Sequence, residues 1–136
     1  MGTAGTRTRC HFDSYHNILA QVVGYKFCIL FPPEVGKGLY PVTGDDAKDS
    51  CAQGNISMID VEEEEEEREG GANPRFPLYP GRKASWMGVL GPGDCLFIPQ
   101  GWWHYIRAIT TSISVNFWWE EEGVKEGGGG REARGS

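Results

Sequence analysis

The sequence predicts a single all-β domain built as an antiparallel jelly-roll barrel. Three observations favour this fold: short runs rich in β-branched and aromatic residues, turns with glycine and proline between these runs, and almost no helical periodicity. A chain of 136 residues has room for one domain with a modest hydrophobic core.

Three strands are expected in the N-terminal part of the chain. They cover residues 8–12, 17–23 and 25–31, where Val, Ile, Leu, Phe and Tyr dominate. Gly24 marks a turn between the second and the third strand, and Pro32 with Pro33 ends the run. Residues 1–7 are expected to form a flexible N-terminus.

Residues from about 34 to about 80 are expected to form a long acidic insert at the surface. Apolar periodicity fades there, while Gly, Asp, Pro and six consecutive glutamates at 62–67 accumulate. We interpret the glutamate run as a solvated, disordered loop rather than a binding element. Without these six glutamates, thirteen of the nineteen acidic residues remain against thirteen basic ones, so the sequence carries no basic footprint for nucleic acid.

Four further strands are expected in the C-terminal part. They cover residues 86–90, 95–98, 104–108 and 112–119, with Gly- and Pro-containing turns at 91–94 and 99–101. In the last strand Ile113, Val115 and Phe117 alternate with polar residues, which predicts one buried apolar face and one polar face. Residues 120–136 are rich in glycine and charge and are expected to be a disordered tail.

The four cysteines indicate an intracellular setting. They are spread along the chain without Cys-x-x-Cys spacing, so neither a zinc knuckle nor a dense disulfide framework is indicated. A reducing compartment, nucleus or cytoplasm, is expected. Because no run approaches the length of a membrane span and the N-terminus lacks the apolar core of a signal peptide, we expect no membrane partner.

His11, Asp13 and His104 are the candidate metal ligands. Residues two apart in a strand point to the same side, so His11 and Asp13 can present two ligands together while Phe12 turns away. Two imidazoles and one carboxylate on one face of a metal leave three positions open, which is typical of non-haem Fe(II) oxygenases. A three-histidine site for zinc or another divalent ion, with His16 in place of Asp13, remains open.

Three separated blocks of the chain resemble the jumonji C (JmjC) domain family, whose fold is the cupin-like double-stranded β-helix. The first is Thr-Arg-Cys-His-Phe-Asp at 8–13 with residues 17–26. The second runs from Leu-Gly-Pro-Gly-Asp at 90–94 to Gly-Trp-Trp-His-Tyr at 101–105, and the third is Ser-Val-Asn-Phe-Trp-Trp at 114–119. The resemblance covers residues 8–119 and is closest to the small JmjC hydroxylases grouped with jumonji domain-containing protein 5.

This resemblance implies an Fe(II)- and 2-oxoglutarate-dependent dioxygenase that hydroxylates a protein side chain. The three candidate ligands would hold Fe(II) and would be the catalytic residues, with 2-oxoglutarate and dioxygen at the open positions. Lys26 matches the lysine that pairs with the distal carboxylate of 2-oxoglutarate. Thr8 and Asn17 match positions that hydrogen-bond this cosubstrate. A protein or peptide substrate is expected, while the oligomeric state is undetermined.

The chain departs from the family before its His-x-Asp pair. Family members have a substantial portion there, whereas ten residues precede His11 in this sequence. We therefore expect residues 8–119 to form a partial domain, a barrel incomplete at its N-terminus with exposed sheet edges. Two alternatives remain: a truncated JmjC-like metal-binding or interaction module without turnover, and a histone lysine demethylase that uses the same chemistry.

Overall fold

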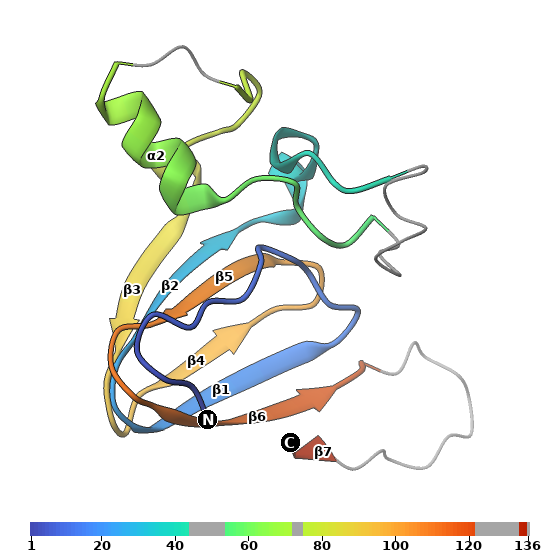
Figure 1. Cartoon of the computed structure of the whole chain (residues 1–136). Coiled ribbons are helices and arrows are strands. Elements are labelled where there is room, and N and C mark those ends of the chain that lie inside the picture. Colours follow the sequence, from blue (N-terminus) through green and yellow to red (C-terminus); the bar gives the residue numbers. More distant parts are fainter. Residues whose placement is uncertain (44–53, 72–74, 122–133, 136) are drawn as a thin grey trace, which may run out of the picture.

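Two antiparallel β-sheets build the domain in the computed structural model, which describes residues 1–43, 54–71, 75–121 and 134–135 (Figure 1). One sheet has the strand order β4-β1-β6-β7 and the other has the order β3-β2-β5. The strands are β1 His16–Val23, β2 Lys26–Phe31, β3 Trp86–Leu90, β4 Cys95–Ile98, β5 Trp103–Ala108, β6 Ile113–Trp119 and β7 Arg134–Gly135. This arrangement confirms the predicted all-β, cupin-type jelly-roll.

Six of the seven predicted strands are confirmed, each within one residue of its expected ends. The prediction of a strand at 8–12 was wrong, because this segment makes only isolated bridges. His11 pairs with His104 on one side and with Ile56 on the other, and Arg7 pairs with Arg107. The segment changes partners from residue to residue, so no continuous ladder forms, yet it lies alongside β5.

Residues 1–7, which the sequence predicts to form a flexible N-terminus, make backbone hydrogen bonds to the rest of the domain. Gly2 and Ser112 exchange two backbone hydrogen bonds of 2.9 and 2.8 Å, and the Gly5 N–H donates to the Ala108 carbonyl at 2.8 Å. Residues 1–7 thus fill backbone positions beside the end of β5. Of the predicted disordered tail, residues 122–133 and 136 lie outside the described part of the chain, and β7 pairs with Phe117 and Trp118 of β6.

The acidic run forms helix α2 (Val61–Glu69), so its interpretation as a disordered loop was wrong. Asp60 caps the helix, since its side chain accepts a hydrogen bond of 3.2 Å from the Glu63 N–H. Glutamates in the first turn also favour the positive end of the helix dipole. The Asp-x-x-Glu start and the Glu64–Arg68 ion pair at i and i+4 are helix signals that were present in the sequence.

The insert is a packed layer on the outer face of sheet β3-β2-β5, where it contacts β2 and β5. It contains two short 3₁₀ helices, η1 (Pro33–Leu39) and η2 (Arg82–Ala84), besides α2. Its buried side chains form one hydrophobic cluster with β2, β5 and Cys10; the cluster members are Cys10, Ile29, Phe31, Leu39, Ile59, Val61, Tyr79, Trp103 and Tyr105. Several residues of the predicted surface insert thus belong to the hydrophobic core.

A second cluster lies between the two sheets. Leu19, Leu96 and Ile98 from one sheet meet Cys28, Leu30 and Leu90 from the other, with Trp102 and Ile106 packed against them. These residues define the interior face of each sheet, because side chains alternate along a strand. The same alternation places Lys26 with Cys28 and Leu30 on the inner face of β2.

The two faces of β6 are reversed relative to the prediction. Its polar side chains turn inward: the Ser114 hydroxyl lies 2.7 Å from Gln21 Oε1, and Asn116 accepts a hydrogen bond from Asn17. The apolar residues turn outward, with Ile113 39% and Phe117 40% exposed. The interior of the barrel is thus polar beside β6, where a polar ligand could bind.

Candidate metal centre

His11 and His104 are brought together by their own backbones. The His11 N–H donates to the His104 carbonyl at 3.1 Å, and the His104 N–H donates to the His11 carbonyl at 2.8 Å. Asp13 follows two residues after His11, and its carbonyl accepts a hydrogen bond from the Gly101 N–H at 3.0 Å. Segments from the two ends of the chain therefore meet at one point of the fold.

The three side chains converge with ligand atoms that all lie within 4.8 Å of one another. Asp13 Oδ2 lies 3.7 Å from His11 Nε2 and 3.5 Å from His104 Nε2, and the two imidazole centroids are 4.3 Å apart. Two imidazole nitrogens and one carboxylate oxygen form a donor set suited to a divalent transition metal with open coordination positions. Among the described residues, this is the group of His, Cys, Asp and Glu side chains that could hold a metal ion.

Backbone contacts set the histidine tautomers that metal binding needs. His11 Nδ1 lies 2.7 Å from the Arg9 carbonyl oxygen, and His104 Nδ1 lies 3.1 Å from that of Trp102. Since a carbonyl oxygen only accepts, each Nδ1 carries the proton and each Nε2 keeps a free lone pair toward Asp13. The residues present therefore fit a bound metal.

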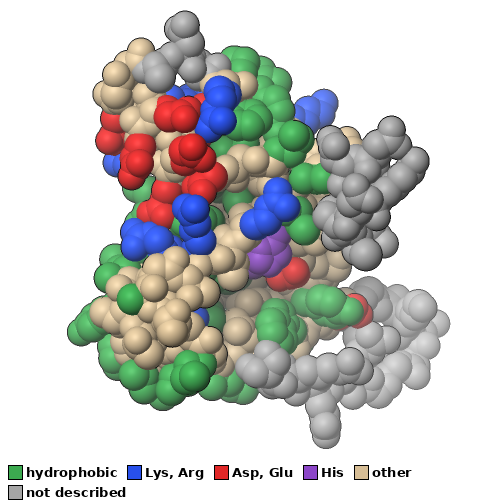
Figure 2. Space-filling model, in the orientation of Figure 1, with side chains coloured by type: hydrophobic (Ala, Val, Ile, Leu, Met, Phe, Trp, Pro, Cys, Tyr) green, Lys and Arg blue, Asp and Glu red, His purple; other side chains and the backbone are tan. Residues whose placement is uncertain are grey.

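Burial keeps His104 neutral. Desolvation, followed by repulsion from His11, lowers the pKa of His104 to about 4. The neutral imidazole is the form that binds a metal. The His104 side chain is 5% exposed, whereas those of His11 and Asp13 are 27% and 34% exposed, so the centre opens to solvent on their side. Figure 2 shows a histidine beside acidic atoms in a hollow of the molecular face.

The alternative prediction of a three-histidine site was wrong, because His16 lies on the outer face of its sheet. Its ring stacks on Phe97 and Trp119, with centroid distances of 5.7 and 5.5 Å. Its Nδ1 accepts a hydrogen bond of 2.9 Å from the Gln100 N–H, and Nε2 lies 3.4 Å from a Glu121 carboxylate oxygen. Of the two candidates for the third ligand, the structure brings only Asp13 to the two histidines.

Lys26 and His104 share the interior face of sheet β3-β2-β5. Leu30 pairs with His104, and Lys26 pairs with Ala108 at the other end of the same two strands. Lys26 is half-buried, and desolvation lowers the pKa of its ammonium. Within the described residues no carboxylate pairs with it, so an anionic ligand between the sheets would offset its desolvation.

Asn17 is buried inside the barrel with one polar atom unsatisfied. Its Nδ2 donates to Asn116 Oδ1 at 3.2 Å, whereas its own Oδ1 has no hydrogen-bond partner among the described residues. A buried polar atom without a partner is costly, which favours a ligand or water beside it. Sequence reasoning missed Asn116, because the alternation in β6 was taken to place its polar side chains outside.

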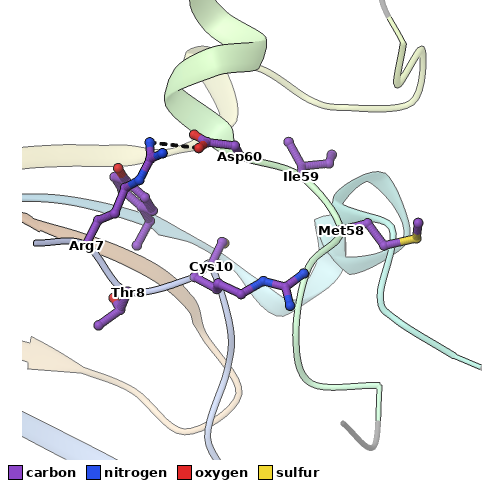
Figure 3. A pocket seen from close by; sticks show the side chains of 8 residues that line it. Arg7, Thr8, Cys10, Met58, Ile59 and Asp60 are labelled. Carbon is purple, nitrogen blue, oxygen red and sulfur yellow. Dashed lines mark ion pairs between the residues drawn. The ribbon is translucent and has the colours of Figure 1, made fainter. Parts of the chain in front are cut away.

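Thr8 lies elsewhere, at an exposed position where its hydroxyl is 3.4 Å from the Ile106 carbonyl oxygen. It belongs to a separate pocket of about 300 Å³ between residues 7–10 and 58–60 (Figure 3). Arg7 Nη1 pairs with Asp60 Oδ2 at 2.8 Å across its rim, as the figure shows, and Arg9 donates to the Ser57 carbonyl. The charged groups of this pocket are thus engaged with the protein itself.

No helix in the described part of the chain is long and apolar enough to cross a membrane.

Comparison with known proteins gives consistent matches over nearly the whole chain. A family described as "Cupin-like domain" matches residues 1–124. "JmjC domain-containing protein F" of Dictyostelium discoideum is 38% identical over 127 residues, which are 87% of this chain and 25% of that protein. "Jumonji C domain-containing protein 5" of Drosophila melanogaster is 39% identical over 120 residues, 88% of this chain and 26% of that protein. "Lysine-specific demethylase 8" of Xenopus tropicalis is 40% identical over 119 residues, 87% of this chain and 24% of that protein. The chain thus spans about a quarter of the length of these relatives.

Proposed function

Since the chain belongs to the cupin-like domain family, as a JmjC domain, we propose that it is an Fe(II)- and 2-oxoglutarate-dependent oxygenase that hydroxylates a protein side chain. The observation that carries this proposal is the convergence of His11 Nε2, His104 Nε2 and an Asp13 carboxylate oxygen. These three atoms would hold Fe(II). With 2-oxoglutarate and dioxygen, the bound iron supplies oxidative decarboxylation coupled to oxidation of a substrate C–H bond.

Lys26 and Asn17 would bind and orient the cosubstrate between the sheets. The half-buried Lys26 ammonium would pair with the distal carboxylate of 2-oxoglutarate. Asn17 Nδ2 donates one of its two N–H groups to Asn116 Oδ1, and its second N–H would donate to an oxygen of the cosubstrate. The apolar cluster around Leu30 and Ile106 would keep water from the interior between Lys26 and His104. Thr8 remains a predicted contact of the cosubstrate. To bind it, the Thr8 hydroxyl would have to turn away from the Ile106 carbonyl oxygen.

The substrate is proposed to be a protein or peptide, because the open side of the centre lies at the molecular surface beside His11 and Asp13. Removal of a methyl group from lysine is the second candidate, since hydroxylation of an N-methyl carbon gives a hemiaminal, whose C–N bond breaks to release the lysine amine and formaldehyde. The names of relatives such as "Lysine-specific demethylase 8" favour this candidate. For either substrate, the proposed location is intracellular, in the nucleus or the cytoplasm.

The decisive experiment measures succinate. The chain is incubated with Fe(II), 2-oxoglutarate, ascorbate and oxygen, with and without a peptide library, and succinate is quantified by NMR. Iron-dependent succinate that increases with particular peptides supports the proposal, and the mass of the modified peptide separates hydroxylation from demethylation. Metal binding without retention of 2-oxoglutarate would instead indicate a metal-binding or interaction module without turnover.

A further inference from the structure

The start of helix α2 lies against both segments that carry the metal-site histidines. Asp60, the N-cap, pairs with Arg7, four residues before His11. Glu62, in the first turn, contacts two side chains of β5, the strand that carries His104. The insert is therefore joined to both sides of the metal centre by charged contacts.

Glu62 makes most of these contacts through its one carboxylate. Its Oε2 accepts hydrogen bonds from the Tyr105 hydroxyl at 2.5 Å and from Arg107 Nε at 2.8 Å, and its Oε1 accepts one from Arg107 Nη2 at 3.0 Å. A two-point guanidinium–carboxylate pair is geometrically specific as well as strong. The Glu62 side chain is 23% exposed, so water competes with these bonds only in part.

These bonds restrain β5 from the side opposite the metal. Side chains alternate along a strand, so Tyr105 points into the layer under the insert while His104 points into the barrel. Arg107 bridges to Arg7 through the backbone, and Arg7 in turn pairs with Asp60. The two histidine-bearing segments are thereby held to the same helix end. They are also joined directly by backbone hydrogen bonds, at His11–His104, Thr8–Ile106 and Thr6–Ala108.

We propose that Glu62 is a positioning residue for the metal centre: by binding Tyr105 and Arg107, it adds a side-chain restraint to the backbone pairing that holds the two histidine-bearing segments together. This role rests on the proposed metal site. Without the Glu62 carboxylate, β5 would lose its hydrogen bonds to the helix. The distance between the His104 and His11 imidazoles would then vary more.

The test measures the affinity of the full chain for Mn(II) alone, by the EPR signal of free Mn(II), at a temperature where every variant is folded. Glu62→Ala is expected to weaken binding by about tenfold, the lower end of the effect of residues that orient metal ligands. The Mn(II) affinity of Glu62→Gln should lie between those of wild type and Glu62→Ala. The Gln amide oxygen can still accept a hydrogen bond from Tyr105, but it carries no charge. Glu66→Ala removes an exposed carboxylate from the same helix and should bind as wild type does.

A variant with a core defect separates positioning from general stability. Leu90→Ala opens a cavity in the other cluster and should lower the melting temperature without weakening Mn(II) binding. If Glu62→Ala binds Mn(II) as tightly as Glu66→Ala, or if Leu90→Ala loses as much affinity, the positioning role is overturned. A wild-type chain that binds no divalent metal would overturn the proposed function itself, and the positioning role with it.

Discussion

His11 and His104 form a backbone pair in which each residue donates its N–H to the carbonyl of the other, at 3.1 and 2.8 Å. The side chains of such a directly opposed pair lie next to each other. The fold therefore sets the distance between the two imidazoles before any metal binds, and Asp13 completes the donor set from the same segment.

The first prediction concerns the identity of the third ligand. Asp13→Ala should weaken Mn(II) binding by at least about a hundredfold, because loss of one of three ligands removes a large part of the binding free energy. His16→Ala should leave binding unchanged, because this ring packs on Phe97 and Trp119 outside the barrel. Isothermal titration calorimetry of both variants decides the question. Equal losses in the two variants would contradict the ligand assignment.

The second prediction concerns the cosubstrate. Lys26→Met should weaken 2-oxoglutarate binding to the Mn(II)-loaded chain by about 10- to 100-fold, the usual worth of a hydrogen bond to a charged group. Mn(II) affinity should not change, because Lys26 lies at the far end of β2 from the metal. Lys83→Met, at an exposed position of η2, is the matched control. Unchanged 2-oxoglutarate affinity in Lys26→Met would remove Lys26 from the site.

The strands and the three side chains of the candidate metal site could be predicted from the sequence because their signals are local. A strand shows as an apolar run between turns, and His11 with Asp13 shows as a two-residue spacing, although their segment makes only isolated bridges. The signal that decides which face of β6 turns inward is not local. Ile113 and Phe117 would suit a buried face, yet both are exposed. The inward turn of Asn116 depends on its partner Asn17 across the sheet.

Helix α2 was missed for a different reason. Its charged composition resembles that of a disordered segment, and the interactions that stabilise it are largely tertiary. Val61 is fully buried under the sheet, and Glu62 binds Arg107 of a strand more than forty residues away. Composition alone could not reveal these partners, although the cap at Asp60 was readable.

The third prediction is a pH dependence of stability that comes from Glu62. Burial raises the pKa of Glu62, but hydrogen bonds from Arg107 and Tyr105, with the charge of Arg107, outweigh it and hold the pKa below 4.5. Between the lowered pKa of Glu62 in the folded chain and its ordinary pKa in the unfolded chain, the unfolded chain therefore binds more protons than the folded chain. The stabilisation by Glu62 is therefore complete above pH 4.5 and is lost as the pH falls through the folded pKa.

Urea unfolding of wild type and Glu62→Gln across this range checks the sign. The difference in free energy of unfolding between the two should be largest above pH 4.5 and should shrink toward acid. The pH dependence that His104 contributes is common to both chains and cancels in the difference. Glu66→Gln should follow wild type at every pH, and a difference independent of pH would contradict the prediction.

The last prediction concerns the outer face of sheet β4-β1-β6. Ile18 pairs with Phe97 on one side and Phe117 on the other, and these two phenylalanines are 50% and 40% exposed. Strands β1, β4 and β6 contain no Lys, Arg, Asp or Glu. This sheet therefore presents an uncharged apolar face to solvent, and such a face binds apolar dyes.

The chain should therefore enhance the fluorescence of anilinonaphthalene sulfonate in its native state, and Phe97→Ser with Phe117→Ser should remove most of this enhancement. The melting temperature should change little, because substitutions at exposed positions shift stability by about 0.5 kcal/mol or less. Leu78→Ser, which is 67% exposed in the insert, is the control for a single exposed apolar side chain and should keep the dye signal. If the double variant binds as much dye as wild type, the apolar surface that the dye detects lies elsewhere, and the outer face of this sheet is covered in solution.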